Sequence, residues 1–443
     1  MKRRSATGQT GELVTRPWAG RLVKNAVALM ISTGGTGVLG IVFWGLATHL
    51  ATVRAVGRTS AEISAMILLA SLAQLSFGTI FERFLPVAGT QTRSFVIRAY
   101  VMCVIFALVV ASIYAFTGLA HRLLPSSFLW RSLFVLAVAL WTIFALQDSV
   151  LIGLRASRWV PVENILFAIM KLALLPVLIA TLHDQGIFLA YSAPVTLTLI
   201  AVNWYLFRKR IPEHEAIRAP TETLPRSREL VLLAGAQYTT LLLGAGATLV
   251  VTLIVIQRLG AIANAHYYVP AMISGSLSIF LSSVFKSFVV EAASEPHALR
   301  HHTNMAIAAM SVVIVPSVLI GIIFAPTILR VFGASYAAKS TTLLRMLLLS
   351  LPLDAVSVFY SAFAWLDRRV WWMTLRALIS AVIYFGIIFM LIGHHGIQSI
   401  GIASLVSSAL QGIFFLPIAI RRYRLTTNFE APRDGEPETA PAT

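Results

Sequence analysis

Two charged side chains lie deep inside long apolar runs, where ionisable residues are rare. Lys171 lies about nine residues into the run 162–182, and Asp354 lies about eleven residues before the end of the run 342–365. Charge at that depth in a membrane costs several kcal/mol, so it usually faces protein or water and marks a functional position. A lysine there can attract a phosphate through charge-assisted hydrogen bonds. The two residues are therefore predicted either to form a structural ion pair or to line a cavity, with Asp354 tuning or gating it.

A second group of charged residues lies near the ends of apolar runs, on the side assigned below to the cytoplasm. Charge costs little there, because a long side chain can reach the headgroup region. The group allows two interpretations: ordinary anchoring, or a charged ring at a vestibule that receives an anionic headgroup. Its members are Glu82, Arg83, Asp148, Lys286 and Glu291, while Arg345 and Arg376 near other run ends are interpreted as anchors.

The elements that carry these residues must be membrane-spanning helices. Mean hydropathy is +0.81, and only 12% of the residues are charged, about half the fraction typical of a soluble domain. A spanning helix needs about 20 apolar residues, and lipid offers its backbone no hydrogen-bond partners. The sequence predicts an all-α polytopic membrane protein with about twelve transmembrane helices. Their expected ranges are 25–49, 62–81, 99–118, 132–152, 162–182, 186–207, 230–256, 266–289, 304–325, 342–365, 371–393 and 398–420.

The basic residues occupy every second connection between these runs. With the N-terminus inside, the cytoplasmic segments hold 24 Lys and Arg residues and the external segments hold 7. This bias follows the positive-inside rule and predicts that both termini are cytoplasmic. The formal charge of +17 is therefore expected to meet anionic membrane lipids. A role with nucleic acid is excluded, because no segment is long enough to form a folded basic domain.

The longest internal connection is polar, contains proline and follows the sixth run, so it divides the chain into six helices plus six. An even number of spans in each half gives both halves the same orientation, as in transporters built from parallel repeats. The expected units are a basic cytoplasmic leader at 1–24, an N-lobe at 25–207, a linker at 208–229, a C-lobe at 230–420 and a disordered cytoplasmic tail at 421–443.

Enzyme and metal signatures are missing from the sequence. It contains no G-x-x-x-x-G-K-[ST] phosphate loop, no H-E-x-x-H and no G-x-S-x-G motif, which argues against an ATPase, a zinc protease or a serine hydrolase. The single cysteine, Cys103, excludes an intrachain disulfide and a cysteine-based metal site. His297 and His301 have a spacing that can bind metal, but they are interpreted as part of a solvated linker. The sequence thus predicts a protein that is not an enzyme and has no cofactor and no metal.

Several stretches of the sequence carry a family resemblance, among them KNAVALMISTGGTGVLGIVFWGLATHL at 24–50, SAEISAMILLASLAQLSFGTIFERFLP at 60–86 and LRASRWVPVENILFAIMKLALLP at 154–176. They resemble bacterial polysaccharide-biosynthesis membrane proteins. These are the oligosaccharidyl-lipid flippases of the multidrug/oligosaccharidyl-lipid/polysaccharide (MOP) exporter superfamily. The similarity extends over about 25–420 and is one of overall pattern.

The resemblance implies two six-helix lobes around a central cavity. It also implies a function: moving a polyprenyl-diphosphate-linked oligosaccharide from the inner to the outer leaflet by alternating access. Lys171 falls in the matching stretch MKLALLP, and Glu82 and Arg83 fall in FERFLP, so the resemblance assigns these residues to the cavity. Drug antiporters of the superfamily commonly use a carboxylate in the first helix, and none is present in the run 25–49. Lipid II flippases usually have fourteen spans instead of twelve.

The leading prediction is therefore a flippase for a lipid-linked glycan, with polysaccharide-synthesis enzymes as possible partners. Three alternatives remain open. The first is a cation-coupled drug antiporter of the same superfamily. The second is a non-transporting membrane scaffold of a polysaccharide-synthesis complex, in which Lys171 and Asp354 would pair statically. The third is an embedded glycan ligase or polymerase, which the short external connections disfavour.

Overall fold

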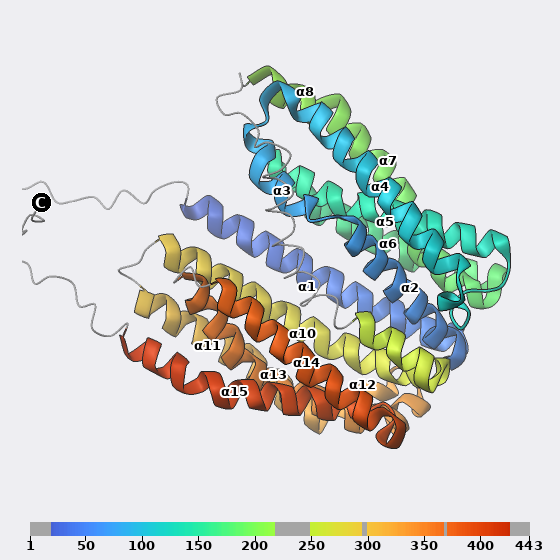
Figure 1. Ribbon diagram of the computed structural model, residues 1–443, viewed down its shortest axis with the longest axis vertical. Coiled ribbons are helices and arrows are strands. Elements are labelled where there is room, and N and C mark those ends of the chain that lie inside the picture. Colours follow the sequence, from blue (N-terminus) through green and yellow to red (C-terminus); the bar gives the residue numbers. More distant parts are fainter. Residues whose placement is uncertain (1–18, 218–248, 295–298, 367–369, 426–443) are drawn as a thin grey trace, which may run out of the picture.

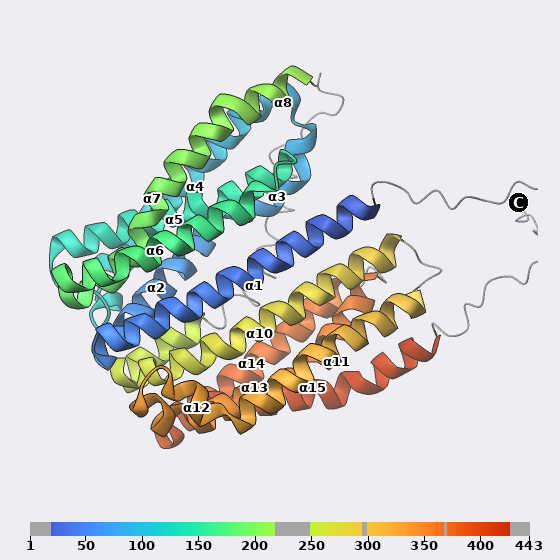
Figure 2. The same ribbon diagram turned by 180° about the vertical axis from the view of Figure 1, so that it is seen from behind.

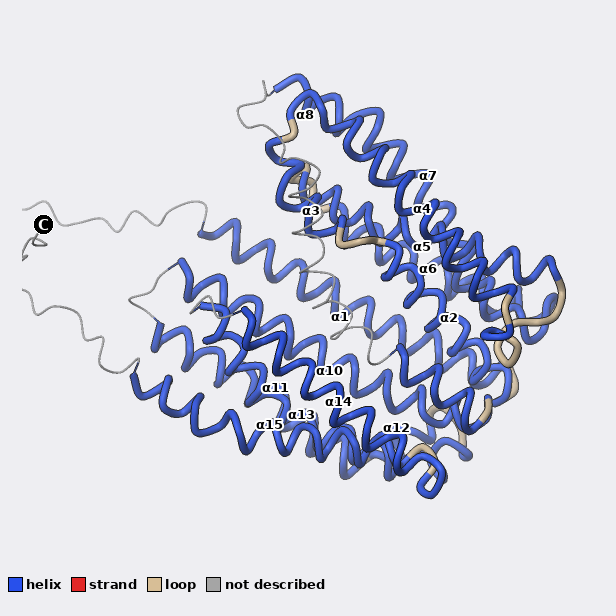
Figure 3. Tube along the Cα trace, in the orientation of Figure 1, coloured by secondary structure: helices blue, strands red, loops and turns tan. Residues whose placement is uncertain are grey.

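The computed structural model describes residues 19–217, 249–294, 299–366 and 370–425. Within these ranges the chain forms helices joined by short turns, and no strand occurs. The helices form two bundles that meet at one end and diverge towards the other (Figures 1 and 2). Figure 3 shows that the loops of the described residues lie mainly at the two ends of the bundles, with a further break between α2 and α3.

The first bundle contains the N-terminal helices. The helix α4 packs on α5, α6 packs on α7, and α1 lies along α6. A π-helical turn, Leu206–Arg210, connects α7 directly to α8, so the predicted linker at 208–229 begins inside helical chain. The helices are α1 (Ala19–Leu50), α2 (Val53–Ala73), α3 (Phe77–Phe84), α4 (Thr92–Phe116), α5 (Phe128–Gly153), α6 (Trp159–Leu182), α7 (Gly186–Tyr205) and α8 (Ile211–Ile217).

The second bundle is centred on α13, which packs against both α10 and α15. Its helices are Leu249–Leu259, α10 (Ala261–Ser294), α11 (Leu299–Ile323), α12 (Ala325–Arg330), α13 (Ala334–Leu366), α14 (Val370–His395) and α15 (Gln398–Leu425). Because α15 runs to Leu425, the first five residues of the predicted disordered tail at 421–443 are helical. The expected run 230–256 lies largely outside the described residues.

The protein is a polytopic membrane protein by the length and composition of its helices. Among the described residues, eight helical stretches are long and apolar enough to cross a membrane, and one of them, Trp159–Ala216, contains both α6 and α7. Large apolar side chains are exposed on their outer faces, as expected of surfaces that contact lipid. Val312 and Met390, for example, are 71% and 78% exposed.

The prediction of one helix at 62–81 is wrong. The helix α2 begins at Val53, where the Thr52 hydroxyl accepts a hydrogen bond from the backbone N–H of Ala55. The segment then breaks between α2 and α3, where Leu75 and Ser76 have φ angles of 48° and 61°, a left-handed conformation that costs a non-glycine residue about 1–2 kcal/mol. Protein covers most of α2, so its sequence does not need the apolar character from which lipid-facing helices are recognised.

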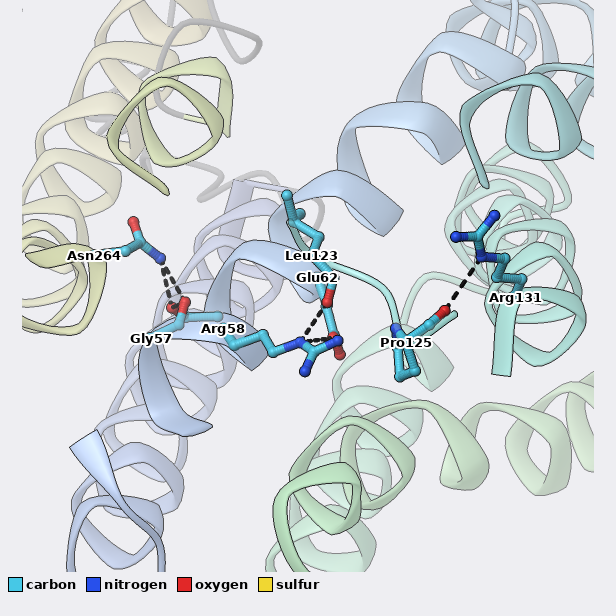
Figure 4. Close-up of polar contacts among 8 residues, drawn as sticks. Gly57, Arg58, Glu62, Leu123, Pro125, Arg131 and Asn264 are labelled. Atoms are coloured by element: carbon cyan, nitrogen blue, oxygen red, sulfur yellow. Dashed lines mark hydrogen bonds and ion pairs between the residues drawn. The ribbon is translucent and has the colours of Figure 1, made fainter. Parts of the chain in front are cut away.

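The two bundles touch through a close crossing of α2 and α10. At Gly57 a Cβ atom would lie 1.8 Å from the carbonyl oxygen of Ala261, so only glycine allows the backbones to approach this closely. The side-chain amide of Asn264 donates to the Gly57 carbonyl oxygen at 2.7 Å and to the Ser60 hydroxyl at 3.0 Å (Figure 4). Nearby, the rings of Trp44 and Tyr268 pack edge to face.

We expect Gly57→Ala to destabilise the protein by about 1–3 kcal/mol, because the added methyl group forces α2 and α10 apart. Thermal unfolding of the detergent-purified protein measures the effect as a lower melting temperature. Gly275→Ala on α10 is the matched control, because a Cβ atom there meets no atom within 4 Å. Equal melting temperatures for the two variants would contradict the close crossing.

Candidate functional site

Lys171 lies inside the first bundle, surrounded by aromatic rings. Its side chain projects from α6, and the residue is only 7% exposed. The ammonium nitrogen lies 4.7 Å from the ring centre of Tyr191 on α7, 5.0 Å from that of Phe167 and 5.4 Å from that of Phe43 on α1. Trp141 from α5 stacks on Tyr191 at 5.3 Å. Four helices therefore contribute to this aromatic cage.

The cage stabilises the ammonium without neutralising it. A cation over an aromatic face gains about 2 kcal/mol when desolvated, far less than full hydration supplies. Among the described residues the ion pairs are Arg58–Glu62 and Arg210–Glu213, and neither involves Lys171. No described ion pair therefore occupies Lys171, and its amino group is open to an anion.

Asp354 lies in the second bundle, in a seam of hydroxyl and amide groups between α13, α14 and α15. The Ser408 hydroxyl donates to its carboxylate at 2.5 Å, and the Arg376 guanidinium on α14 interacts with it electrostatically. Arg376 also donates to the side-chain oxygen of Gln411 at 2.8 Å. The predicted ion pair between Lys171 and Asp354 does not form. Arg376 was interpreted from the sequence as an anchor, but it belongs to this internal seam.

The seam continues along α13 and α15 through residues three or four positions apart. Ser404 donates to Ser350 at 3.0 Å, and the Gln411 amide donates to Ser380 at 2.9 Å. Hydroxyl-to-hydroxyl bonds of this kind join helices in lipid, where apolar side chains offer no polar partner. Asp354 is thus the charged member of a hydrogen-bonded contact between three helices.

No hydrogen bond or ion pair joins the five predicted vestibule residues in the described part of the chain, where Asp148 on α5 accepts a hydrogen bond from Asn164. Glu82 and Arg83 are exposed on α3, where the Ser149 hydroxyl of α5 donates to Glu82 at 3.1 Å and Arg83 lies over the ring of Phe84. Lys286 and Glu291 belong to α10, but their side chains lie outside the described residues. The charged ring therefore stays a prediction.

Two buried carboxylates escaped the sequence analysis. Glu62 is 2% exposed and lies in the interior of α2, where Arg58 pairs with it at 3.3 Å (Figure 4). The expected second run, 62–81, begins at Glu62, so hydropathy placed this residue at the end of the helix instead of its interior. The i, i+4 spacing of Arg58 and Glu62 is the signal that would have extended the helix. The other carboxylate, Glu163 on α6, is 4% exposed.

Comparison with known proteins yields structural relatives only. No family model and no curated protein matches the chain. An inward-facing multidrug resistance MATE family transporter of the MOP superfamily matches with a TM-score of 0.65 and 15% identity, over 92% of this chain and 100% of the other. Its outward-facing counterpart matches with a TM-score of 0.60 and 15% identity, over 91% and 96%.

The chain has the fold of these transporters. A third match is a MOP superfamily transporter from Pyrococcus furiosus, whose description reports a binding pocket of reverse polarity that suggests a different function. Its TM-score is 0.60 at 15% identity, over 91% of this chain and 96% of the other. The predicted all-α fold with two lobes is confirmed. Identities of 14–15% extend the likeness to fold alone and do not distinguish the flippases from the multidrug transporters.

We expect Lys171→Met to leave the melting temperature unchanged or to raise it. The substitution keeps the length of the side chain and removes a buried charge without a carboxylate partner, and such a change is often neutral or stabilising. Thermal unfolding in detergent tests this expectation. A fall of several degrees would show that the aromatic cage depends on the ammonium for its own stability.

Proposed function

We propose that this protein is a transporter that moves a lipid-linked oligosaccharide with an anionic phosphate group across the bacterial inner membrane by alternating access. Lys171 carries the proposal. A buried ammonium held by aromatic rings and lacking a carboxylate partner among the described residues fits a cargo that brings its own negative charge. A site for cationic drugs requires the opposite polarity.

The distribution of basic residues supports an arrangement that opens towards the cytoplasm. The bundles diverge at the end that carries the exposed residues of α3 and α8 (Figure 1), where Arg83, Arg155, Arg158 and the run Arg208–Arg210 lie. The positive-inside rule supports assigning this end, and with it both termini, to the cytoplasm. Basic residues there also meet anionic membrane lipids. In this proposal the N-lobe at 25–207 and the C-lobe at 230–420 are the rocking units.

An apolar groove at the same end suits the lipid portion of such a cargo. It has a volume of about 350 Å³ and lies between α11, α13 and α15. Met310, Phe359, Phe363, Leu416 and Ile420 are among its lining residues, and Tyr423 at its edge donates to Asn304 at 2.8 Å. A hydrocarbon chain gains about 25 cal/mol for each Å² that it buries there.

The proposed cycle requires the contact between α2 and α10 to open while the diverging end closes. The hydrogen bonds of Asn264 to Gly57 and Ser60 are buried in this arrangement, so they must break for that contact to open. In the second bundle, the hydrogen bonds of Asp354 link three helices, so this carboxylate is placed to govern their movement. Polysaccharide-synthesis enzymes are the natural suppliers and consumers of the cargo.

A cation-coupled drug antiporter is the second candidate, because the matching structures include multidrug resistance transporters. The seam around Asp354 offers that function a carboxylate, although Ser408 and Arg376 already engage it. Efflux of a cationic dye from vesicles driven by a proton or sodium gradient distinguishes the two candidates. A flippase for an anionic lipid shows no such efflux.

The decisive test uses a deletion strain and its membrane lipids. We expect lipid-diphosphate oligosaccharide to accumulate in the inner leaflet of the strain and the wild-type gene to relieve that accumulation. Lys171→Ala should insert normally and fail to relieve it, because the cargo phosphate loses its counter-charge. Full rescue by a normally expressed Lys171→Ala would remove Lys171 from the substrate site. An unaltered leaflet distribution with surface glycan intact would contradict the flippase.

Asp354→Asn is expected to slow turnover more than it weakens substrate binding, because it alters a contact between moving helices and leaves Lys171 in place. The transport rate and the half-saturating substrate concentration, measured together in proteoliposomes, separate the two effects. An unchanged transport rate would remove Asp354 from the mechanism.

A further inference from the structure

A second buried polar cluster lies in the first bundle, about 12 Å along α6 from Lys171. Its centre is Glu163. The side-chain amide of Gln147 on α5 donates to one oxygen of Glu163, and the Gln147 oxygen accepts from the Asn203 amide of α7 at 2.8 Å. The second hydrogen of that amide is donated to the Leu199 carbonyl oxygen at 3.0 Å. Gln147 is fully buried.

A parallel pair lies beside it on the same two helices. The Asn164 amide of α6 donates to one oxygen of Asp148 on α5 at 3.2 Å, and its other hydrogen goes to the Val160 carbonyl oxygen at 2.9 Å. An asparagine amide carries two hydrogens. Both hydrogens of Asn164 and of Asn203 are therefore committed, and neither residue has one left for the remaining carboxylate oxygens.

Four buried oxygen atoms of this cluster lack a hydrogen-bond partner among the described residues. They are Glu163 Oε2, Asp148 Oδ1, Asn203 Oδ1 and the Tyr100 hydroxyl. Tyr100 on α4 is 9% exposed and lies near enough to both carboxylates to interact with them electrostatically. Four neighbouring helices thus contribute buried oxygens to the cluster. The Tyr100 hydroxyl hydrogen and the second amide hydrogen of Gln147 can satisfy at most two of the three carboxylate and amide oxygens, so acceptors remain in excess.

Such an excess of acceptors calls for a positive charge. One proton satisfies at most one pair of oxygens, whereas a hard metal cation binds several oxygen ligands at once. Carboxylates also compensate the charge of such a cation when it is buried. We propose that Asp148 and Glu163, together with the side-chain oxygens of Asn203 and Tyr100, bind a hard metal cation such as Na⁺ or Ca²⁺. This site goes beyond the proposed function, because it requires no particular cargo.

The break between α2 and α3 lies next to this cluster. Cys103, one turn along α4 from Tyr100, donates its thiol to the Gln74 carbonyl oxygen at 3.6 Å, and Gln74 immediately precedes the two left-handed residues of the break. Interrupted helices commonly accompany the ion sites of transporters, because they free backbone groups inside the bundle. A metal cation bound in the cluster would therefore lie close enough to this break to affect its geometry.

The test is thermal unfolding of the full-length protein in detergent, at constant ionic strength and pH, with N-methylglucamine chloride replaced by NaCl or by CaCl₂. We expect one of the two salts to raise the melting temperature by about 3 °C or more, with saturation as its concentration rises. The salt that acts identifies the charge of the bound ion. Failure of the glycolipid assay leaves this result unaffected, so the two proposals fail separately.

Variants locate the effect. Glu163→Gln and Asp148→Asn should abolish the ion-dependent rise, and Tyr100→Phe should weaken the apparent affinity several-fold. Glu213→Gln is the control, because Glu213 is an exposed carboxylate at the same end of the bundle, paired with Arg210, and it should keep the full response. No response to either salt, or an equal response in Glu163→Gln, overturns the proposal. A melting temperature that changes with pH but not with either salt also overturns the proposal, and it indicates that Asp148 and Glu163 share a proton instead.

Discussion

The close crossing of α2 and α10 is the contact on which the arrangement of the two bundles depends. Gly57 has no side chain, so the backbones of α2 and α10 meet directly. The side-chain amide of Asn264 on α10 donates both of its hydrogens to groups on α2. Polar bonds between helices are modest in lipid, at about 0.6 kcal/mol on average. The crossing of α2 and α10 is therefore closely packed but only weakly stabilised by hydrogen bonds, so it can maintain this arrangement of the bundles and still separate. From this crossing the bundles diverge, which separates α3 from α11 (Figure 2).

Much of the fold follows from hydropathy, because lipid imposes a length and an apolar surface on each helix that it touches. The helices α4 to α7, α11 and α13 to α15 agree with the expected ranges to within several residues, whereas the short helix α12 was not predicted. The prediction failed at α2 because this helix does not contact lipid along most of its length. That helix is covered by protein, carries Arg58 and Glu62, and is rich in serine and alanine, so hydropathy underestimates its length and cannot detect the break that follows it.

The candidate site was partly predictable. Lys171 and Asp354 were identified by their depth in apolar runs, because a charge in the membrane interior is costly and usually marks a functional position. Their surroundings could not be predicted, since the cage combines rings from α1, α5, α6 and α7, which are brought together only by packing. Glu163 was overlooked because it stands one turn inside its helix, where anchoring explains a charge equally well. Only its burial against Gln147 distinguishes it.

The break at Leu75 and Ser76 divides one membrane crossing into two parts with different attachments. The part before the break, α2, is fastened to α10 of the opposite bundle. The part after it, α3, is pressed so tightly on α5 that a Cβ atom at Gly153 would lie 2.6 Å from the Phe81 carbonyl oxygen. A few residues between two such segments can absorb a large change in backbone angles. The break can therefore act as a joint between α2, which contacts α10 as well as its own bundle, and α3, which stays packed on α5.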